Sequence, residues 1–465
     1  MRPLEITSAL LIAFYILWAL IGRPQTVITK IIPVIVMAVL LVHLIVEKYR
    51  WQMLPLYFLA AMFCLLVVFN RQYIPTRWLT IPAVILLIPA IALPILLPVP
   101  NVSKPDGPYQ VGTMTFALTD NSRREIYSSN PTIPRRFMIQ VWYPASPHPD
   151  DKTAPWMPNA SIYAPAISDL LKLPHFFLDH LELVTTPAFQ NAPLARSNTA
   201  YPVIVFSHGW KGFRAQNTVQ MIDLASHGYV VIGMEHTYGA VTTVFPDGTI
   251  APNNPSALPD GMPDEIYFPA ARLLVNQWAG DIGYALDFMA QQNDDTQSPF
   301  HNLLDLNKVG VFGHSTGGGA TIEFCGTDPR CKAGFAEDPY MTPVSEEVMT
   351  KGVSQPFFFM FSETWTGDVK AENTNNRLFR QFQPNASQSL GAVTIAGSAH
   401  YDFTDLPMLT PLAPQLHLKG PINGPLVIRI VNDYLLSFFD KTLKGMPETL
   451  FNGRPPYPDV IPFPE

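Results

Sequence analysis

The spacing of hydrophobic residues divides the chain into two unlike parts. Apolar side chains form four long stretches within the first hundred residues, at 4–21, 31–46, 54–69 and 79–97. Each is roughly as long as a helix that crosses a bilayer, and a cleaved signal peptide would account for the first alone. The pattern predicts an all-α membrane segment of about four helices at residues 1–100, which anchors a second domain at residues 101–465.

Charged residues between these stretches leave the orientation of the membrane segment open. If all four stretches cross, the amino terminus and the second domain lie on one side of the bilayer. Basic residues are then equally divided, with Arg2, Lys48, Arg50 and Lys104 on that side and Arg23, Lys30, Arg71 and Arg77 on the other. Among His, Lys, Arg, Asp and Glu residues, only His43 lies inside a stretch away from its ends, which favours an anchor over a transport pathway.

Beyond residue 100 the pattern changes, and short apolar runs alternate with segments of helical periodicity. The runs at 202–206, 229–234 and 309–312 are continuous and apolar, as in strands buried on both faces. Helical patterns at 216–227 and 266–289 separate them, which predicts an α/β fold with a parallel sheet and right-handed crossovers. Further strands are expected at 112–118, 137–143, 333–336, 357–361 and 391–395, and a closing helix at 426–439. Residues 147–165 and the proline-rich tail from Pro447 are expected to be irregular.

Charge and cysteine content exclude some classes of function. The formal net charge is −7 at pH 7 and no block of like charge occurs, so nucleic-acid binding is not expected. The three cysteines suit neither a disulfide framework nor a zinc site. Cys64 lies in an apolar stretch, whereas Cys325 and Cys331 flank the expected end of one helix. The latter two either form a disulfide, which would indicate an oxidising compartment, or are buried free thiols.

The candidate chemistry is concentrated at Ser315, within Gly313-His314-Ser315-Thr316-Gly317. An apolar run precedes this motif, and a small-residue stretch that can begin a helix follows it. A serine on such a strand–turn–helix element exposes its hydroxyl as a nucleophile. The two glycines are expected because the strand and the helix pass close to each other. The run at 202–206 ends at Ser207-His208-Gly209-Trp210, a loop that can direct backbone N–H groups toward the nucleophile.

A serine nucleophile needs a histidine base, which an acid orients. In the chain order serine, acid, histidine, the base follows the last strand, where the sequence has His400. His417 alone lies further along, with no strand before it. Two acids remain open: Asp338, after the strand at 333–336 and next to Glu337, and Glu363, after the strand at 357–361.

Several motifs between about residues 104 and 439 resemble the plasma-type platelet-activating-factor acetylhydrolases, a family of α/β-hydrolase phospholipases. The resembling segments are 107–116, 185–188, 206–214, 223–228, 235–236, 313–318 and 397–400. The resemblance implies an α/β-hydrolase fold with Ser315, His400 and Asp338 as a triad, because residues 337–343 resemble the family's acid-bearing segment. With the general rule for this fold, it also implies an oxyanion hole formed by the backbone N–H groups of Trp210 and Thr316.

These observations lead to the hypothesis of a membrane-anchored serine esterase that removes short or oxidised sn-2 acyl chains from glycerophospholipids. Its partners would be a lipid or ester substrate and the membrane. No cofactor is expected, and no metal, because His208, His236 and His314 lack ligand spacing. The alternatives are a broad carboxylesterase or polyester hydrolase, and a receptor or scaffold that keeps the shape without the activity. The usual location of the resembled family and the cysteine pair favour an extracytoplasmic catalytic domain. The oligomeric state stays open.

Two further segments bear on the substrate. Residues 170–181 are unusually apolar, as in a flap over an acyl pocket, a patch that rests on lipid, or an ordinary buried helix. Residues 245–269 do not match the resembled family, and a loop there would change the acyl pocket.

Overall fold

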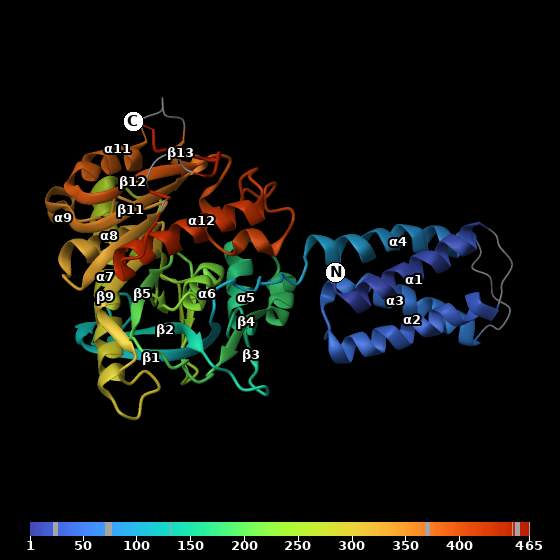
Figure 1. Ribbon diagram of the computed structural model, residues 1–465. Helices are drawn as coiled ribbons and strands as arrows, with labels where there is room; N and C mark the ends of the chain where they lie inside the picture. The colour runs from blue at the N-terminus through green and yellow to red at the C-terminus, as the bar shows by residue number, and fades with distance from the viewer. Residues whose placement is uncertain are drawn as a thin grey trace.

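Figure 1 shows the two parts of the computed structural model side by side, an elongated bundle of four helices and a larger body built around a sheet. Residues 97–109, which contain neither helix nor strand, connect them. The structure describes residues 1–21, 27–69, 77–130, 132–367, 373–448, 450–451 and 456–464. Arg23 and Arg71, which enter the count of basic residues above, lie outside these ranges.

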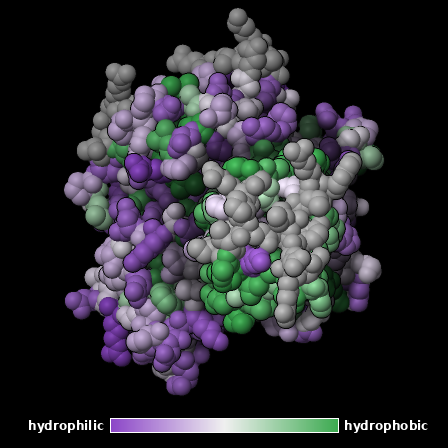
Figure 2. All heavy atoms as spheres, turned by 90° about the vertical axis from the view of Figure 1, so that its right-hand side faces the viewer, coloured by the Kyte–Doolittle hydropathy of each residue, from purple (hydrophilic) through white to green (hydrophobic). Residues whose placement is uncertain are grey.

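The N-terminal bundle has apolar side chains both between its helices and on its surface. Its elements are α1 (Pro3–Leu20), α2 (Val27–Val46), the 3-10 helix η1 (Trp51–Met53), α3 (Leu54–Phe69) and α4 (Arg77–Leu96). Ile12 and Leu59 are fully buried between helices, whereas Leu10 and Ile85 are 65% and 63% exposed. Figure 2 shows hydrophobic side chains gathered over the bundle, against a mostly hydrophilic body behind it.

Three helical segments in the described part of the bundle are long and apolar enough to cross a membrane: Pro3–Leu20, Trp51–Phe69 and Leu79–Leu96. The apolar portion of the remaining helix, Lys30–Val46, is shorter. Helices are therefore present at all four predicted stretches. That all four cross a membrane stays a prediction.

The body is organised by an eleven-stranded sheet in the order β13-β12-β11-β10-β9-β5-β6-β2-β1-β4-β3. Neighbouring strands are parallel from β12 to β6, and β2 is antiparallel to both β6 and β1. A separate hairpin joins β7 (Thr242–Val244) to β8 (Ile250–Pro252). The strands of the large sheet are β1 (Gln110–Arg124), β2 (Pro134–Ala145), β3 (Thr153–Pro155), β4 (Thr185–Gln190), β5 (Tyr201–Ser207), β6 (Val230–Glu235), β9 (Leu304–His314), β10 (Cys331–Glu337), β11 (Val353–Ser362), β12 (Ala386–Ile395) and β13 (Val460–Pro462).

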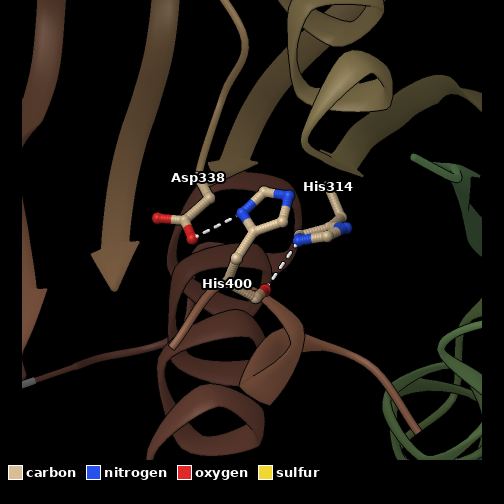
Figure 3. Close-up of side chains that lie close together, drawn as sticks. All are labelled: His314, Asp338 and His400. Carbon is tan, nitrogen blue, oxygen red and sulfur yellow. Dashed lines mark hydrogen bonds and ion pairs between the residues drawn. The ribbon is translucent and has the colours of Figure 1, made fainter. Parts of the chain in front are cut away.

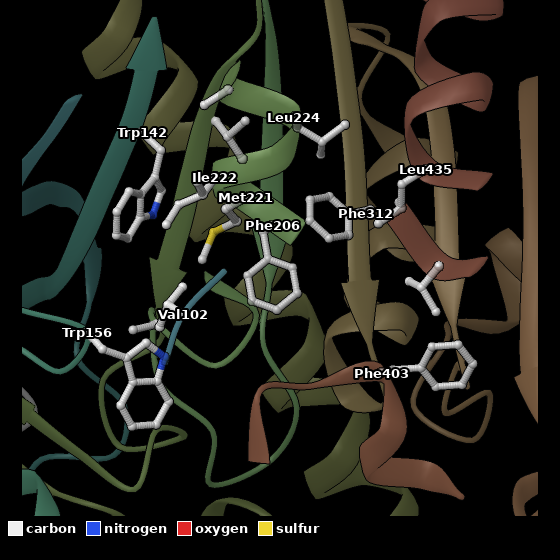
Figure 4. Close-up of a cluster of buried hydrophobic side chains, with 14 of the residues drawn as sticks. Val102, Trp142, Trp156, Phe206, Met221, Ile222, Leu224, Phe312, Phe403 and Leu435 are labelled. Atoms are coloured by element: carbon white, nitrogen blue, oxygen red, sulfur yellow. The ribbon is translucent and has the colours of Figure 1, made fainter. Parts of the chain in front are cut away.

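Helices cover both faces of this sheet and bury one apolar cluster on each side. On one face, Phe206 and Phe312 of the sheet meet Leu224 and Leu435 from two covering helices (Figure 4). Continuous apolar strands require this double cover, since both of their faces must leave water. The first face carries α5 (Ala160–Leu170), α6 (Thr218–Ser226) and α12 (Gly424–Phe439), and the second carries α7 (Asp264–Asp294), α8 (Thr316–Thr327), α9 (Glu346–Lys351) and α11 (Thr374–Phe382).

The parallel sheet and its connecting helices confirm the sequence-based prediction, and two expectations are wrong. The tail is not irregular throughout, because β13 pairs antiparallel with β12. Residues 147–165 contain β3 and the first turns of α5. Each of these two strands has only three residues, too few to produce a recognisable alternation. They form because the edge of a sheet offers unpaired backbone groups.

Candidate active site

Ser315 lies at the turn between β9 and α8, with an unusual backbone conformation. Its φ and ψ are 57° and −120°, a region that residues with a side chain rarely occupy. Its N–H donates to the carbonyl of Glu337 at 2.9 Å, which ties the turn to β10. A Cβ on Gly313 would overlap the Gly317 carbonyl, and one on Gly317 would overlap the Ser207 carbonyl. The close approach predicted for the two glycines is therefore confirmed.

The loop that follows β5 packs against this turn. A Cβ on Gly209 would lie 3.3 Å from the Cβ of Ser315 and 3.2 Å from His314 Nδ1. Trp210 is the next residue of the loop, and Thr316 is the first residue of α8, whose first-turn N–H groups have no partner within the helix. The fold thus brings together the two backbone segments from which an oxyanion hole would be built.

His400 and Asp338 are directly hydrogen bonded. Asp338 follows β10, and His400 begins the 3-10 helix η5 (His400–Phe403) shortly after β12. His400 Nδ1 donates to Asp338 Oδ2 at 2.9 Å, as Figure 3 shows. The backbone N–H and the hydroxyl of Ser362 donate to the same carboxylate, each at 2.6 Å. This arrangement fixes the imidazole tautomer and leaves Nε2 as its basic nitrogen.

The other two acids considered from the sequence have different partners. The carboxylate of Glu363, at the start of the short helix α10 (Glu363–Thr366), accepts a hydrogen bond from the backbone N–H of Gly397. Glu337 is buried and accepts from Asn217 Nδ2 at 3.2 Å. Within the described residues, the structure therefore brings Asp338, and neither Glu337 nor Glu363, into hydrogen-bond contact with His400.

Two side chains that hold His400 were not predicted to do so. The indole of Trp365 stacks on the imidazole, with ring centroids 4.2 Å apart and planes at 14°. His314 Nε2 donates to the His400 carbonyl at 2.9 Å, while its Nδ1 accepts from Gln216 Nε2 at 3.2 Å. His314 was visible in the serine motif, but its partner is 86 positions away and no local pattern indicates the contact.

Burial determines the protonation of these groups. It raises the pKa of Asp338 to about 7, although the hydrogen bonds from Ser362 act to lower it. Burial lowers the pKa of His400, so its imidazole is neutral and available as a base at pH 7. Burial, and then the nearby His400, lower the pKa of His314 to about 3. A neutral His314 has one donor and one acceptor nitrogen, as its two hydrogen bonds require.

A buried network supports the loop beside Ser315. His208 Nδ1 donates to the Gly209 carbonyl at 2.7 Å, and its Nε2 accepts from the His236 N–H at 3.1 Å. His236 Nδ1 in turn donates to Asp281 at 2.9 Å, and Asp281 pairs with Arg135 at 2.6 Å. The loop-shaping role predicted for His208 and His236 is confirmed. The part played by Arg135 and Asp281 was not predicted, because they come from distant elements, β2 and α7.

The ligand atoms of His314, Asp338 and His400 lie within 4.8 Å of one another, a spacing that a metal ion could bridge. His208 and His236 do not belong to this group. Both nitrogens of His314, Nδ1 of His400 and both oxygens of Asp338 already hydrogen bond to protein atoms. A metal would have to displace these bonds, so the group suits proton transfer better than metal binding.

Two cavities adjoin the neighbours of His400. One, of about 360 Å³, is largely apolar and reaches Trp210 and Tyr401. The other, of about 580 Å³, is lined by Trp365 together with polar and charged side chains such as Asp264, Tyr340 and Arg377. Several side chains from residues 260–268 line the polar cavity and none of them lines the apolar one.

A strained serine between a parallel strand and a helix, with an acid and a histidine after later strands, defines the class of α/β hydrolases. A solved structure of a ferulic acid esterase from Streptomyces cinnamoneus has the same fold, with a TM-score of 0.62 and 23% identity. The aligned region covers 79% of this chain and 100% of the esterase chain.

The sequence also matches the family model described as platelet-activating factor acetylhydrolase, isoform II, over residues 98–266 and 285–449. The expectation that residues 245–269 do not match the family is therefore wrong for residues 245–266. The chain belongs to this family, and it is a serine ester hydrolase. A platelet-activating factor acetylhydrolase of Cavia porcellus is 29% identical over 371 residues, 74% of this chain and 78% of the relative. A probable 1-alkyl-2-acetylglycerophosphocholine esterase of Arthroderma benhamiae is 24% identical over 389 residues, 77% of this chain and 92% of the relative. Cutinase 2 of Thermobifida cellulosilytica is 27% identical over 145 residues, 31% of this chain and 42% of the relative.

Proposed function

We propose that this protein is a membrane-anchored serine esterase that hydrolyses short or oxidised sn-2 acyl esters of glycerophospholipids. Its triad would be Ser315, His400 and Asp338. The observation that carries the proposal is the 2.9 Å hydrogen bond between His400 and Asp338, on loops that meet at the Ser315 turn. The names of the relatives from Cavia porcellus and Arthroderma benhamiae support this class of substrate.

In this mechanism His400 Nε2 removes the proton of the Ser315 hydroxyl as its oxygen attacks the ester carbonyl carbon. Asp338 orients the imidazole and stabilises the imidazolium that forms. The backbone N–H groups of Trp210 and Thr316 donate to the carbonyl oxygen as it becomes negative. The tetrahedral intermediate then expels the lysophospholipid alkoxide, which takes the proton from His400. A water molecule, deprotonated by His400, releases the acyl group by the same route.

The two cavities suit the two ends of such a substrate. The apolar cavity of about 360 Å³ would receive the acyl chain, because burial there removes methylene groups from water. The polar cavity of about 580 Å³ would receive the glycerol and headgroup side, because polar and charged side chains line it. Residues 260–268 would then influence headgroup selection more than acyl-chain length.

The proposed anchor is the N-terminal bundle at residues 1–100, with the catalytic domain at 101–465. Apolar side chains on the outside of the bundle suit lipid as the surrounding solvent. Cys325 and Cys331 are bonded to each other, which supports an extracytoplasmic position for the catalytic domain. Full reaction of both cysteines with a thiol reagent, in denatured but unreduced protein from the native host, would contradict that position.

A broad carboxylesterase or polyester hydrolase is the second candidate, favoured by the similarity to cutinase over 145 residues. Both candidates use the same triad, so substrate range separates them. The test is hydrolysis of phosphatidylcholines whose sn-2 chain varies from acetyl to palmitoyl, by wild type, Ser315→Ala and a control, Ser256→Ala. Ser256 is an exposed serine in a short 3-10 helix at residues 255–257. We expect a rate that falls with chain length and drops by about a thousandfold or more in Ser315→Ala alone. Hydrolysis of simple esters but of no phospholipid would favour the second candidate, and an unchanged rate in Ser315→Ala would overturn the mechanism.

A further inference from the structure

The end of the bundle nearest the body has the character of a membrane–water boundary. Glu5 and Arg50 form an ion pair there, with Arg50 Nε 2.7 Å from the carboxylate. Tyr49 and Trp51 flank Arg50 in the turn between α2 and α3. Charged pairs and amphipathic aromatic side chains are typical of the headgroup level of transmembrane helices. If the bundle crosses a bilayer, the turn at residues 47–53 lies at the bilayer surface.

This boundary is hydrogen bonded to the body at two separate places. Trp51 Nε1 donates to the carbonyl of Phe177 at 3.1 Å, and Gln52 Nε2 donates to His180 Nδ1 at 2.8 Å. Both acceptors belong to the 3-10 helix η2 (His175–Leu183). The second place is Thr410, whose hydroxyl donates to the carbonyl of Leu96 at the end of α4, at 2.6 Å. The bundle is therefore docked against the body as well as joined to it by residues 97–109.

The docking bond to His180 needs an uncharged imidazole. Burial, and then the positive charge of Arg50, lower the pKa of His180 to about 4. Its Nδ1 is therefore free to accept from Gln52 throughout the physiological pH range. Packing adds to this contact, since the ring of Trp51 meets that of Phe176 edge-on with centroids 5.4 Å apart.

The segments docked to the bundle also adjoin the walls of the apolar cavity. Ile167 and Leu170 line it from α5, and Leu171 lines it from the turn between α5 and η2. Leu406, Leu409 and Leu418 line it from the segment that contains Thr410. On the outside of the same two segments, large apolar side chains remain exposed: Phe176 at 51%, Leu412 at 36% and Leu416 at 55%. Figure 1 shows these parts of the body, α5 and the orange-to-red loops before α12, on the side that faces the bundle.

We propose that the docked bundle holds the mouth of the apolar cavity at the bilayer surface, so that the acyl chain of a bilayer lipid enters from the leaflet without crossing water. This inference rests on the proposed function and deepens it by naming the source of the substrate. The exposed apolar side chains of Phe176, Leu412 and Leu416 rest on the lipid around the bundle. The occupant of this surface is thus the bilayer, because the membrane helices end beside it.

The first test uses the full chain in phosphatidylcholine vesicles and compares two substrates. These are a bilayer-resident phosphatidylcholine with an oxidised, shortened sn-2 chain, and soluble p-nitrophenyl acetate. We expect Leu416→Asp to reduce hydrolysis of the bilayer substrate by about tenfold and to leave the soluble substrate within about twofold, because the carboxylate resists contact with lipid. The matched control is Leu273→Asp on α7, where a leucine is 51% exposed. The inference would be overturned if Leu416→Asp hydrolysed the bilayer substrate as fast as the wild type does. It would also be overturned if Leu416→Asp lost the same fraction of activity on both substrates.

A second test does not depend on catalysis. A fluorophore on Leu416→Cys, in a Cys64→Ser background, should be quenched by brominated phosphatidylcholine, whereas one on Leu273→Cys should not. Adding Gln52→Leu and Thr410→Val should weaken the quenching, and Thr410→Ser should preserve it because the hydroxyl is retained. Unquenched fluorescence at position 416 would overturn the docking geometry. A quenched label with no phospholipid hydrolysis would instead contradict the proposed substrate while leaving the geometry intact.

Discussion

Two buried acid–base pairs, Glu5–Arg50 in the bundle and Asp338–His400 in the body, differ in what their burial leaves accessible. In the bundle, Glu5 and Arg50 are both inaccessible, and Arg50 also donates to the carbonyls of Pro94 and Leu97. In the body, Asp338 is inaccessible but His400 is 20% exposed, with its Nε2 left for chemistry. Both side chains of the first pair are held by hydrogen bonds within the protein, as suits a buried structural pair. The second pair leaves His400 partly exposed, which suits its proposed role as a base.

The two regions also differ in where they place apolar side chains. The body encloses its large aliphatic and aromatic side chains between a sheet and helices, whereas the bundle exposes many of them. If the bundle lies in a bilayer, as proposed, its exposed apolar side chains contact lipid rather than water, so they do not need to be buried inside the bundle.

The largest effect should come from the proposed catalytic pair, Asp338 and His400. Asp338→Asn should lower kcat by about 10⁴-fold, because an amide cannot stabilise the imidazolium or fix the tautomer. Glu363→Gln, at the rival acid, should lower it by less than about tenfold, since only a hydrogen bond to Gly397 is weakened. The measurement is steady-state hydrolysis of a soluble ester. If Glu363→Gln lowered kcat more than Asp338→Asn did, Glu363 would be the acid that assists His400.

Breaking the structural pair should affect stability and leave the chemistry of the triad intact. Arg50→Met should destabilise the bundle by about 3 kcal/mol, because Glu5 loses a buried partner, although Arg2 remains at 2.8 Å. The double variant Glu5→Leu with Arg50→Met should recover part of this loss. Denaturation in detergent micelles provides the measurement. Arg272→Met is the matched control, since its exposed pair with Glu346 should contribute less than about 1 kcal/mol. Equal effects of Arg50→Met and Arg272→Met would refute the contrast.

A smaller effect is expected from the disulfide that closes the end of α8. Replacing Cys325 and Cys331 together by serine should lower the free energy of unfolding by about 2 kcal/mol, because the loop that the bond closes is short. Cys64→Ser, at the free cysteine of the bundle, should have less effect on unfolding of the body. Chemical denaturation followed by intrinsic fluorescence measures both. A loss confined to Cys64→Ser would contradict the expectation.

The smallest effect concerns the pH dependence of the catalytic pair. Asp338 must be ionised to stabilise the imidazolium, so with its pKa raised to about 7 the rate should fall as the pH drops below that value. Ser362→Ala removes a hydroxyl that stabilises the carboxylate, which raises this pKa further. The acid limb of the profile should therefore move to higher pH, with a loss of about three- to tenfold at pH 7 and little change at pH 9. An unshifted limb would show that another group controls it.

Much of the fold could be read from local patterns, because each part of it depends on residues close together in the sequence. The apolar runs predicted β5, β6, β9, β10, β11 and β12, and the glycines around Ser315 predicted the sharp turn that the structure has. The three-residue strands β3 and β13 could not be predicted, since their pairing depends on an edge that exists only after the sheet forms.

Local sequence patterns specify the turn at Ser315, the alternation of the longer strands and helices, and the position of His400 after the last long strand of the parallel sheet. Only the tertiary structure decided which acid meets that histidine, because Asp338 and His400 are 62 positions apart and Glu363 is closer in sequence. It also decided that Trp365 and His314 hold the imidazole, and that the bundle docks beside the apolar cavity. The physical reason is the same in each case. Hydrogen bonds and ring contacts act over a few ångströms in space, so they depend on how strands are ordered in the sheet rather than on spacing along the chain.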